Sequence, residues 1–244
     1  FSQASVNVRE GSTPDRALVL VDVEEQPTGS LNLGGAFSTN EGFTARISVT
    51  ESNFLGRGQT LQFAVAANEE FANVEFGFFE PALFDRDLLA GFNIYYRDRN
   101  FSEQTFEQTN IGFEPLIGFP LSENGRLILR YRLSQDDIRD VQPNTSRIIE
   151  EEAGNKFTSA VGGTYTYDRR NSVVQPTAGF ILTLNQDFAG LGGDETYSKT
   201  RATARAYASL FDEQVVLSAE VEGGALFSPD DTRITDRFNA GGDS

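Results

Sequence analysis

Apolar and polar residues alternate along most of this 244-residue chain, and that period of two constrains the fold more than any other feature. In Arg126–Leu133 every second residue is leucine or tyrosine, and the residues between them are three arginines and an isoleucine. Thr200–Ala208 repeats the scheme, with alanines between Arg201, Thr203 and Arg205. Successive side chains of a strand point to opposite faces, so such segments predict strands with one apolar and one charged face.

The length of the alternating segments favours a membrane barrel over a soluble sandwich. About eleven of them lie between Gly29 and Phe227, many near the roughly 9–11 residues that a tilted strand needs to cross a bilayer. Strands of soluble sandwiches are shorter, with a mode of about 5–6 residues. A soluble barrel also turns its apolar face inward, whereas arginine and glutamate here need a wet interior. The sequence therefore predicts an all-β fold, an antiparallel transmembrane β-barrel with a polar lumen.

Composition excludes several kinds of site. The chain has no His and no Cys, so a Ser-His-Asp triad, an imidazole or thiolate metal site and a disulfide framework are ruled out. A formal charge of −16 argues against nucleic-acid binding. The paired carboxylates Asp136–Asp137 and Asp230–Asp231 fall in predicted loops that do not flank a substrate cleft. We expect no enzyme activity, no catalytic residues, no metal and no cofactor.

The connections between predicted strands suggest an orientation. One set is short: 53–58, 81–87, 120–125 and 211–214. The alternate set contains long polar segments at 134–156, at 189–197 and after Phe227. Outer-membrane barrels have short periplasmic turns and longer external loops, so Gly29 is expected on the periplasmic side. Phe-Glu-Pro occurs at 79–81 and again at 113–115, which predicts either a weak repeat or two strand ends, because proline donates no ladder hydrogen bond.

Residues 1–26 differ from the rest. Two short predicted strands, 2–9 and 16–25, surround a Gly-Ser-Thr-Pro-Asp turn, and Pro27 ends the second. Two strands alone do not bury a core. We therefore expect residues 1–26 to be the end of a preceding domain and residues 27–244 to be barrel.

Several motifs resemble the outer-membrane protein assembly factor (BamA) family, and they occur in that family's order through nearly the whole chain. The resemblance rests on Glu25-Gln26-Pro27-Thr28-Gly29, Asn53-Phe54-Leu55-Gly56-Arg57-Gly58, Tyr167-Asp168-Arg169-Arg170, Pro176-Thr177-Ala178-Gly179 and Asp236-Arg237-Phe238-Asn239-Ala240-Gly241-Gly242. In the family the first motif joins the last periplasmic POTRA domain to the first barrel strand. The second is a turn after the second strand, and the last begins the sixth external loop.

The resemblance implies an insertion factor for outer-membrane proteins in the bacterial outer membrane. Its first barrel strand would be a lateral gate that templates client strands, here Gly29, Ser30, Leu31, Asn32, Leu33, Gly34, Gly35, Ala36 and Phe37. A periplasmic turn would be Asn53, Phe54, Leu55, Gly56, Arg57 and Gly58. A loop-6 anchor inside the lumen would be Arg237, Phe238, Gly241 and Gly242. The implied partners are client outer-membrane proteins, outer-membrane lipid and lipopolysaccharide, and accessory lipoproteins bound through POTRA domains.

The chain also departs from the family pattern. The family's Arg-Gly-Phe motif, about five C-terminal strands of a sixteen-stranded barrel, and the earlier POTRA domains have no counterpart in these 244 residues. Together with a first residue that is Phe1 and not Met, this suggests a piece of a longer protein.

Residue chemistry alone leaves alternatives open. Gly34 and Gly35 weaken a strand interior, which fits a weak pairing of the first strand with the last one where the barrel closes. Glycines also allow a bend or a bulge. Arg57 is either a lipid-phosphate or domain contact or an ordinary turn residue, and Glu150–Glu152 is either a divalent-cation site or a solvated charge run. The last alternative concerns the charges of the inner face, which line a conducting pore or pair with one another: Arg97, Arg130, Arg132, Arg205, Glu220 and Glu222.

Two rival functions follow from these alternatives. A relative that serves autotransporter assembly or two-partner secretion would keep the fold, and a passive porin would use the charged lumen.

Overall fold

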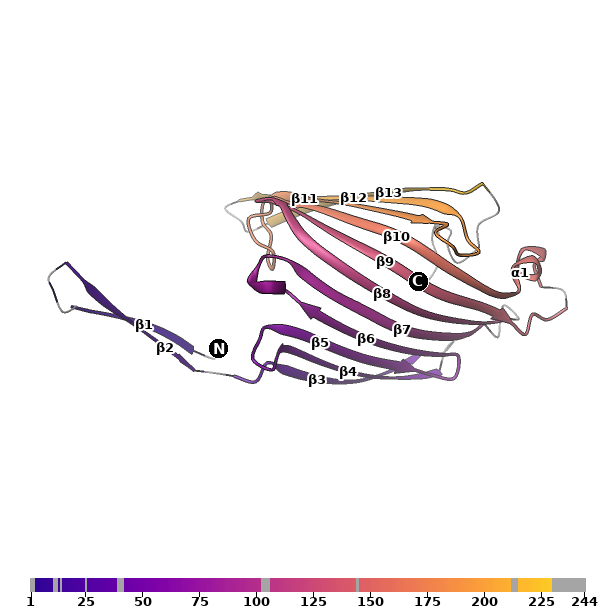
Figure 1. Ribbon diagram of the computed structural model, residues 1–244, viewed down its shortest axis with the longest axis horizontal. Coiled ribbons are helices and arrows are strands. Elements are labelled where there is room, and N and C mark those ends of the chain that lie inside the picture. Colours follow the sequence, from indigo (N-terminus) through magenta and orange to yellow (C-terminus); the bar gives the residue numbers. More distant parts are fainter. Residues whose placement is uncertain are drawn as a thin grey trace.

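The computed structural model describes residues 3–10, 13, 15–24, 26–38, 42–101, 106–143, 145–211 and 215–229. Within these ranges the chain forms a separate two-stranded hairpin and one eleven-stranded antiparallel sheet. The hairpin consists of β1 (Gln3–Glu10) and β2 (Ala17–Glu24). Residues 26–28 connect it to the larger sheet (Figure 1).

The larger sheet is built from strands that follow one another in the chain. They are β3 (Gly29–Ser38), β4 (Gly42–Phe54), β5 (Gln59–Ala67), β6 (Phe71–Glu80), β7 (Leu89–Phe101), β8 (Phe106–Ser122), β9 (Gly125–Arg139), β10 (Gly154–Asp168), β11 (Gly179–Ala189), β12 (Tyr197–Leu210) and β13 (Val215–Phe227). A 3-10 turn, η1 (Leu83–Asp85), lies between β6 and β7, and a short helix, α1 (Arg147–Glu152), lies between β9 and β10.

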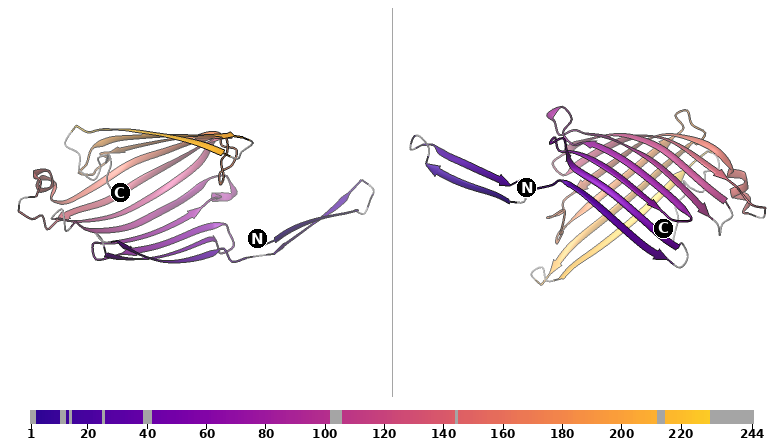
Figure 2. Two further views of the ribbon diagram at one scale, coloured as in Figure 1. Left: turned by 180° about the vertical axis from the view of Figure 1, so that it is seen from behind. Right: turned by 90° about the horizontal axis from the view of Figure 1, so that it is seen from below.

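Each strand of this sheet pairs with its sequence neighbours, so the order from β13 to β3 has no crossover. The sheet curls into an open half-barrel with β3 and β13 along its two free edges (Figures 1 and 2). The predicted all-β barrel wall of about eleven strands is therefore confirmed. We name the end of the sheet where β3 begins the near end, and the end that carries α1 the far end.

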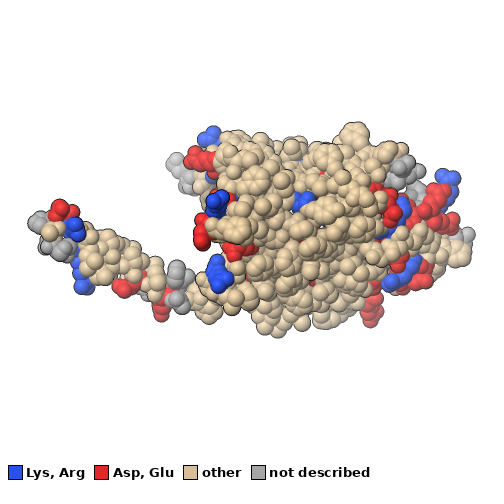
Figure 3. Space-filling model, in the orientation of Figure 1, with Lys and Arg blue, Asp and Glu red and all other residues tan. Residues whose placement is uncertain are grey.

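The two faces of the sheet have the chemistry that the alternation predicts. On the outer face, the rings of Phe76, Phe78 and Phe113 lie about 6 Å from that of Phe92, at 6.0, 6.1 and 5.9 Å between centroids. Figure 3 shows uncharged surface over the middle of the sheet and charged side chains at both ends. An apolar band between two polar rims is the surface of a strand wall in a membrane.

Very few large side chains are fully buried, which also fits a barrel wall. One small cluster at the far end contains Phe106, Ile138 and Ile149, so α1 packs onto the rim of β8 and β9. In the described part of the chain, no helix has the length and apolar character that a membrane crossing requires.

The structure corrects the predicted bounds of the polar segment 134–156. Strand β9 continues to Arg139 and β10 begins at Gly154, so the loop is limited to 140–153. Polar residues extend these strands because they find partners across the sheet. Gln108 donates to Asp136 at 3.0 Å, and Arg139 pairs with Glu107 at 3.0 Å. Asp136 and Asp137 are thus consecutive strand residues on opposite faces, and not a carboxylate pair on a loop as predicted.

The loop-length asymmetry and the Phe-Glu-Pro repeat are weaker than predicted. The longest connection, 140–153, is at the far end, but that end also has the short connection 68–70, and the near end carries 169–178. Glu80 ends β6, whereas Glu114 and Pro115 lie in the middle of β8. Pro115 still opposes Phe92 of β7, and the pairing with β9 is interrupted beside it because proline has no N–H.

Candidate functional site at the free edge of β3

Strand β3 lies at one edge of the eleven-stranded sheet, and β13 lies at the other. Within the described residues β3 pairs with β4 alone, and all ten of its residues are exposed. Its outer face is apolar, and Leu33 and Phe37 are 71% and 76% exposed. A strand edge with unpaired N–H and C=O groups is a template for another strand.

The two central glycines of β3 have different surroundings. A Cβ at Gly34 would have its nearest atom 4.0 Å away, on Arg46, so packing does not require glycine there. A Cβ at Gly35 would lie 3.0 Å from the ring of Phe43, which covers Gly35 on the outer face. The register from Gly29 to Ser38 has no shift, so these glycines do not form the bulge considered as an alternative. The irregularity lies in β4, between Glu51 and Phe54.

Glu51 fastens the start of β3 to β4. Its carboxylate accepts hydrogen bonds from the Thr28 hydroxyl and, at 2.9 Å, from the Asn53 N–H. The Ser52 N–H donates to the Thr28 carbonyl at 3.2 Å. A Cβ at Gly29 would lie 2.9 Å from the Glu51 carboxylate. The carboxylate can approach the β3 backbone this closely because glycine has no side chain. The Pro-Thr-Gly junction is therefore held at the near end.

Glu51 received no role in the sequence analysis, although one signal was present. It has the same parity as Val49 and Ile47, so it occupies an outer-face position where an apolar residue is expected. A charged residue at an apolar register indicates either the end of the apolar band or a specific partner. Here both hold, since Glu51 lies at the end of β4 and bonds to Thr28.

The predicted periplasmic turn is shorter than its motif. Asn53 and Phe54 are the last residues of β4, and the turn itself is Leu55–Gly58. Asn53 closes it, because the Gly58 N–H donates to its side chain at 2.6 Å and the Gly56 N–H donates to its carbonyl at 2.9 Å. Leu55 has a positive φ of 57°, and Arg57 is exposed. The predicted loop-6 residues Arg237, Phe238, Gly241 and Gly242 lie outside the described residues, as do Asp230 and Asp231.

The charges of the lumenal face pair with one another across the strands. Arg97 meets Glu75 at 2.8 Å, Arg132 meets Glu114 at 3.0 Å, Arg130 meets Asp187 at 2.6 Å, Arg201 meets Glu222 at 3.4 Å, and Arg205 meets Glu220. The predicted pairing of these charges across the wall is therefore confirmed. These paired charges lie on the inner face of the sheet, as the alternation predicts.

The ion pair between Arg130 and Asp187 spans three strands. Arg130 lies on β9 and Asp187 on β11, and Gly162 of β10 is opposite both. A Cβ at position 162 would overlap the Asp187 carboxylate and lie 2.8 Å from Nε of Arg130. Each side chain of the pair is only 13% exposed, and Arg130 also donates to Thr164 at 2.7 Å. Gly162 therefore provides the space in which the pair crosses β10.

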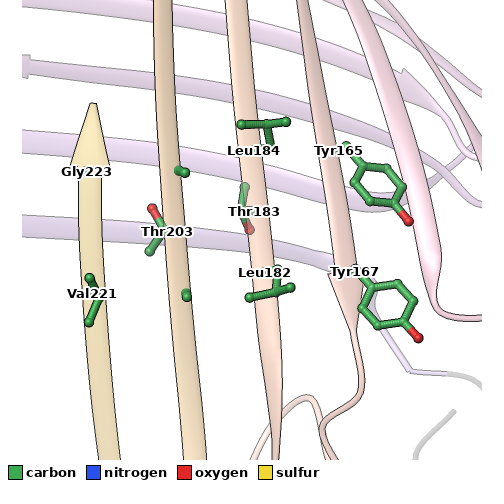
Figure 4. A pocket seen from close by; sticks show the side chains of 10 residues that line it. Tyr165, Tyr167, Leu182, Thr183, Leu184, Thr203, Val221 and Gly223 are labelled. Atoms are coloured by element: carbon green, nitrogen blue, oxygen red, sulfur yellow. The ribbon is translucent and has the colours of Figure 1, made fainter. Parts of the chain in front are cut away.

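A shallow groove of about 500 Å³ follows the outer face along β12 (Figure 4). Tyr165 and Tyr167 of β10 stand on one side and Val221 of β13 on the other. The surface is hollow along β12 because Ala202 and Ala204 have small side chains. None of the ten residues lining the groove is charged. Among the described residues, no three His, Cys, Asp or Glu side chains could hold a metal ion together, Glu150–Glu152 included.

Comparison with known proteins identifies the family. Residues 53–244 match the Omp85 superfamily domain. This chain belongs to the Omp85 superfamily. The outer membrane protein assembly factor BamA of Neorickettsia risticii is 30% identical over 224 residues, which cover 91% of this chain and 30% of the relative. The human sorting and assembly machinery component 50 homolog is 26% identical over 231 residues, covering 91% of this chain and 48% of the relative.

Solved structures support the same Omp85 fold. BamA from Haemophilus ducreyi lacking POTRA domains 1–3 superposes with a TM-score of 0.73 at 20% identity, covering 99% of this chain and 50% of that one. CdiB from Acinetobacter baumannii gives 0.55 at 12% identity, covering 98% and 47%. The chain spans about 30% of the length of the BamA relatives that it matches. Its eleven-stranded sheet is thus part of the transmembrane barrel wall of an Omp85 protein.

Proposed function

We propose that this chain is part of an outer-membrane protein assembly factor, and that the free edge of β3 pairs with strands of client β-barrels during insertion. The chain belongs in the bacterial outer membrane, because its relatives include BamA proteins and its sheet has one apolar and one charged face. Support for the gate comes from the place of β3 as the first strand of the sheet, where it pairs with β4 alone among the described strands, and from relatives that are assembly factors.

The physical argument concerns where a client strand finds a partner. Backbone groups that enter lipid without hydrogen bonds cost several kcal/mol each, roughly. A client strand that pairs with β3 satisfies one row of its groups before it leaves water. The driving force is then the client's own strand pairing and apolar burial, so no nucleotide or other cofactor is required and no catalytic residue is assigned.

The N-terminal hairpin fits the end of a periplasmic POTRA domain. Val6 opposes Val21 and Val8 opposes Val19, and these four side chains form an exposed apolar face. A two-stranded hairpin is not stable alone, so we propose that residues 1–26 complete a domain whose remainder covers this face. That domain would receive clients and accessory lipoproteins on the periplasmic side, which is then the side of the near end.

Crosslinking tests the gate. Cysteines at Leu31 and Leu33, in the whole protein that carries this chain, should crosslink to the terminal strand of a stalled client. Cysteine at Phe113 of β8 is the matched control, since it is also an outer-face apolar position but lies in a strand paired on both sides. Equal yields at β3 and at Phe113 would refute the gate.

The rivals predict different results. A passive porin would conduct steadily in planar bilayers and give no crosslink. A two-partner-secretion transporter would crosslink to its secreted substrate and not to a barrel protein.

A further inference from the structure

The connections at the near end share a feature that β3 and the lumen do not explain. Each of the five, or the strand end that leads into it, carries a large apolar side chain that is largely exposed. These are Leu55, Phe84, Leu121, Val173, Val174 and Phe211, with exposures of 74%, 81%, 57%, 74%, 87% and 75%. Five of them come from the β4–β5, β6–β7, β10–β11 and β12–β13 connections, and Leu121 lies at the end of β8, so they follow the rim from the β3 edge to the β13 edge. We name these six residues the apolar collar.

The backbone at three collar positions is unfavourable for the residues found there. Leu55, Phe84 and Phe211 have φ values of 57°, 58° and 52°. This left-handed region suits glycine and asparagine, and it is a genuine outlier for a bulky residue. Turn chemistry thus disfavours these residues, and so does their exposure to water. The left-handed backbone and the exposed apolar side chain both cost free energy at the same positions. Together they point to an apolar environment that the isolated chain lacks.

The collar continues the membrane-facing surface of the wall. In β8, Ile117 and Phe119 belong to the outer apolar row, and Leu121, at the irregularity between Pro120 and Ser122, adds an exposed apolar side chain at the rim. Phe211 directly follows Leu210, which opposes Val215 at the foot of the outer face. A surface continuous with the apolar band, at its periplasmic limit, faces the headgroup region of the lipid.

Polar groups beside the collar suit a lipid interface. Arg57 and Arg86, each two residues after a collar residue, are exposed and fit lipid phosphates. Asp168 binds Arg170 at 2.6 Å, which raises the pKa of Arg170, and this pair braces the connection that presents the valines. The carboxylate of Glu80 accepts hydrogen bonds from Gln59 at 2.7 Å and the Ala82 N–H at 3.0 Å.

We propose that the apolar collar inserts into the periplasmic leaflet of the outer membrane at the level of the lipid headgroups, where it fixes the depth of the barrel. A lipid leaflet surrounds the whole rim and contacts every connection, whereas a bound protein would cover one sector and leave the others in water. The proposal rests on the membrane location and on the proposed periplasmic side of the near end, and not on the gate, so failure of the β3 crosslink leaves it standing.

The absence of tryptophan from the 244 residues gives a direct test. Phe84→Trp and Phe211→Trp are introduced singly into the whole protein that carries this chain, with any tryptophan elsewhere replaced by phenylalanine. The variants are reconstituted into phosphatidylethanolamine–phosphatidylglycerol vesicles, with and without phosphatidylcholine brominated near the top of its acyl chains. Phe113→Trp, in the middle of the outer face, is the lipid control, and Gln142→Trp, exposed in the far-end loop, is the water control.

The collar tryptophans should lose about half of their fluorescence or more in brominated lipid, as expected for interfacial side chains. They should also be protected from acrylamide relative to Gln142→Trp. If brominated lipid leaves both collar variants unchanged and acrylamide quenches them like the water control, the proposal is wrong. The collar then stands in water, as a surface for a periplasmic protein. Two independent positions keep the test decisive if one variant fails to fold.

Discussion

Replacing Gly162 by alanine tests the lumenal ion pair, because a single methyl group occupies the space where the pair crosses β10. The added Cβ would overlap the Asp187 carboxylate and lie 2.8 Å from Nε of Arg130. Backbone atoms of a paired strand do not move away easily, so the two side chains must separate. Their 2.6 Å contact and the hydrogen bond from Arg130 to Thr164 are then strained or lost.

The expected magnitude follows from the burial of the pair. Breaking a fully buried ion pair costs roughly 3–5 kcal/mol, because charges are left without partners. Arg130 and Asp187 are each 13% exposed and face a wet lumen, so water recovers part of the loss. We expect Gly162→Ala to lower the free energy of unfolding by about 3 kcal/mol, the low end of that range.

The next residue is a matched control. Gly163 belongs to the same strand but points to the outer face, where a Cβ would find its nearest atom 3.5 Å away, an ordinary contact. Gly163→Ala should change stability by no more than about 1 kcal/mol, and in the stabilising direction, because glycine loses more backbone freedom on folding.

Urea unfolding of the whole protein in lipid vesicles, followed by circular dichroism, measures both variants. Gly162→Ala is also combined with Asp187→Ala, which removes the overlapping carboxylate. The two changes should be non-additive by about 1–3 kcal/mol, as for groups in contact. Equal effects of alanine at 162 and 163, or strict additivity with Asp187→Ala, would refute the idea that Gly162 serves the pair.

Three other substitutions test local features. Asp140→Gly should raise the free energy of unfolding by about 0.5 kcal/mol, because glycine adopts the left-handed backbone at this position without a Cβ penalty; a lower urea midpoint would contradict this. Glu51→Ala should speed amide hydrogen exchange at Asn53 about tenfold, as expected for loss of a hydrogen bond near 1.4 kcal/mol. Gly35→Ala should destabilise the protein by about 1 kcal/mol, whereas Gly34→Ala should not, since only the first Cβ is crowded.

The glutamate prediction has its own control. Glu69 is an exposed carboxylate at the far end, and Glu69→Ala should leave exchange at Asn53 unchanged. An equal acceleration by both variants would mean that charge, and not the hydrogen bond, protects the amide.

The sequence was sufficient to predict the class of fold, because strand period and face chemistry repeat in every segment. Strand ends were harder to predict. Five of the six residues 134–139 are polar, and the segment was assigned to a loop, yet it extends β9 because partners such as Gln108 and Glu107 lie on β8. Pro115 was taken for a strand end, but it interrupts the pairing on one side only. Such outcomes depend on neighbours in the sheet and are not encoded in a single segment.

The candidate site was predicted in outline only. Strand β3 ends one residue beyond the predicted Phe37, and its role as a gate remains a proposal. The collar was missed because turns with positive φ are recognised by glycine or asparagine, and Leu55, Phe84 and Phe211 give no such signal. Glu51 was missed because its partner, Thr28, is far away in sequence and is brought near only by the β3–β4 register.

The crossing of β10 by the Arg130–Asp187 pair has a consequence for how related sequences vary. Positions 130 and 187 lie two strands apart, yet their side chains form a direct ion pair, and the pair depends on the absence of a side chain at 162. Covariation between them would resemble that of adjacent strands. Contact maps inferred from such covariation would then place β9 directly beside β11. They would omit β10, which lies between the two strands and contributes only the glycine at 162 to this crossing.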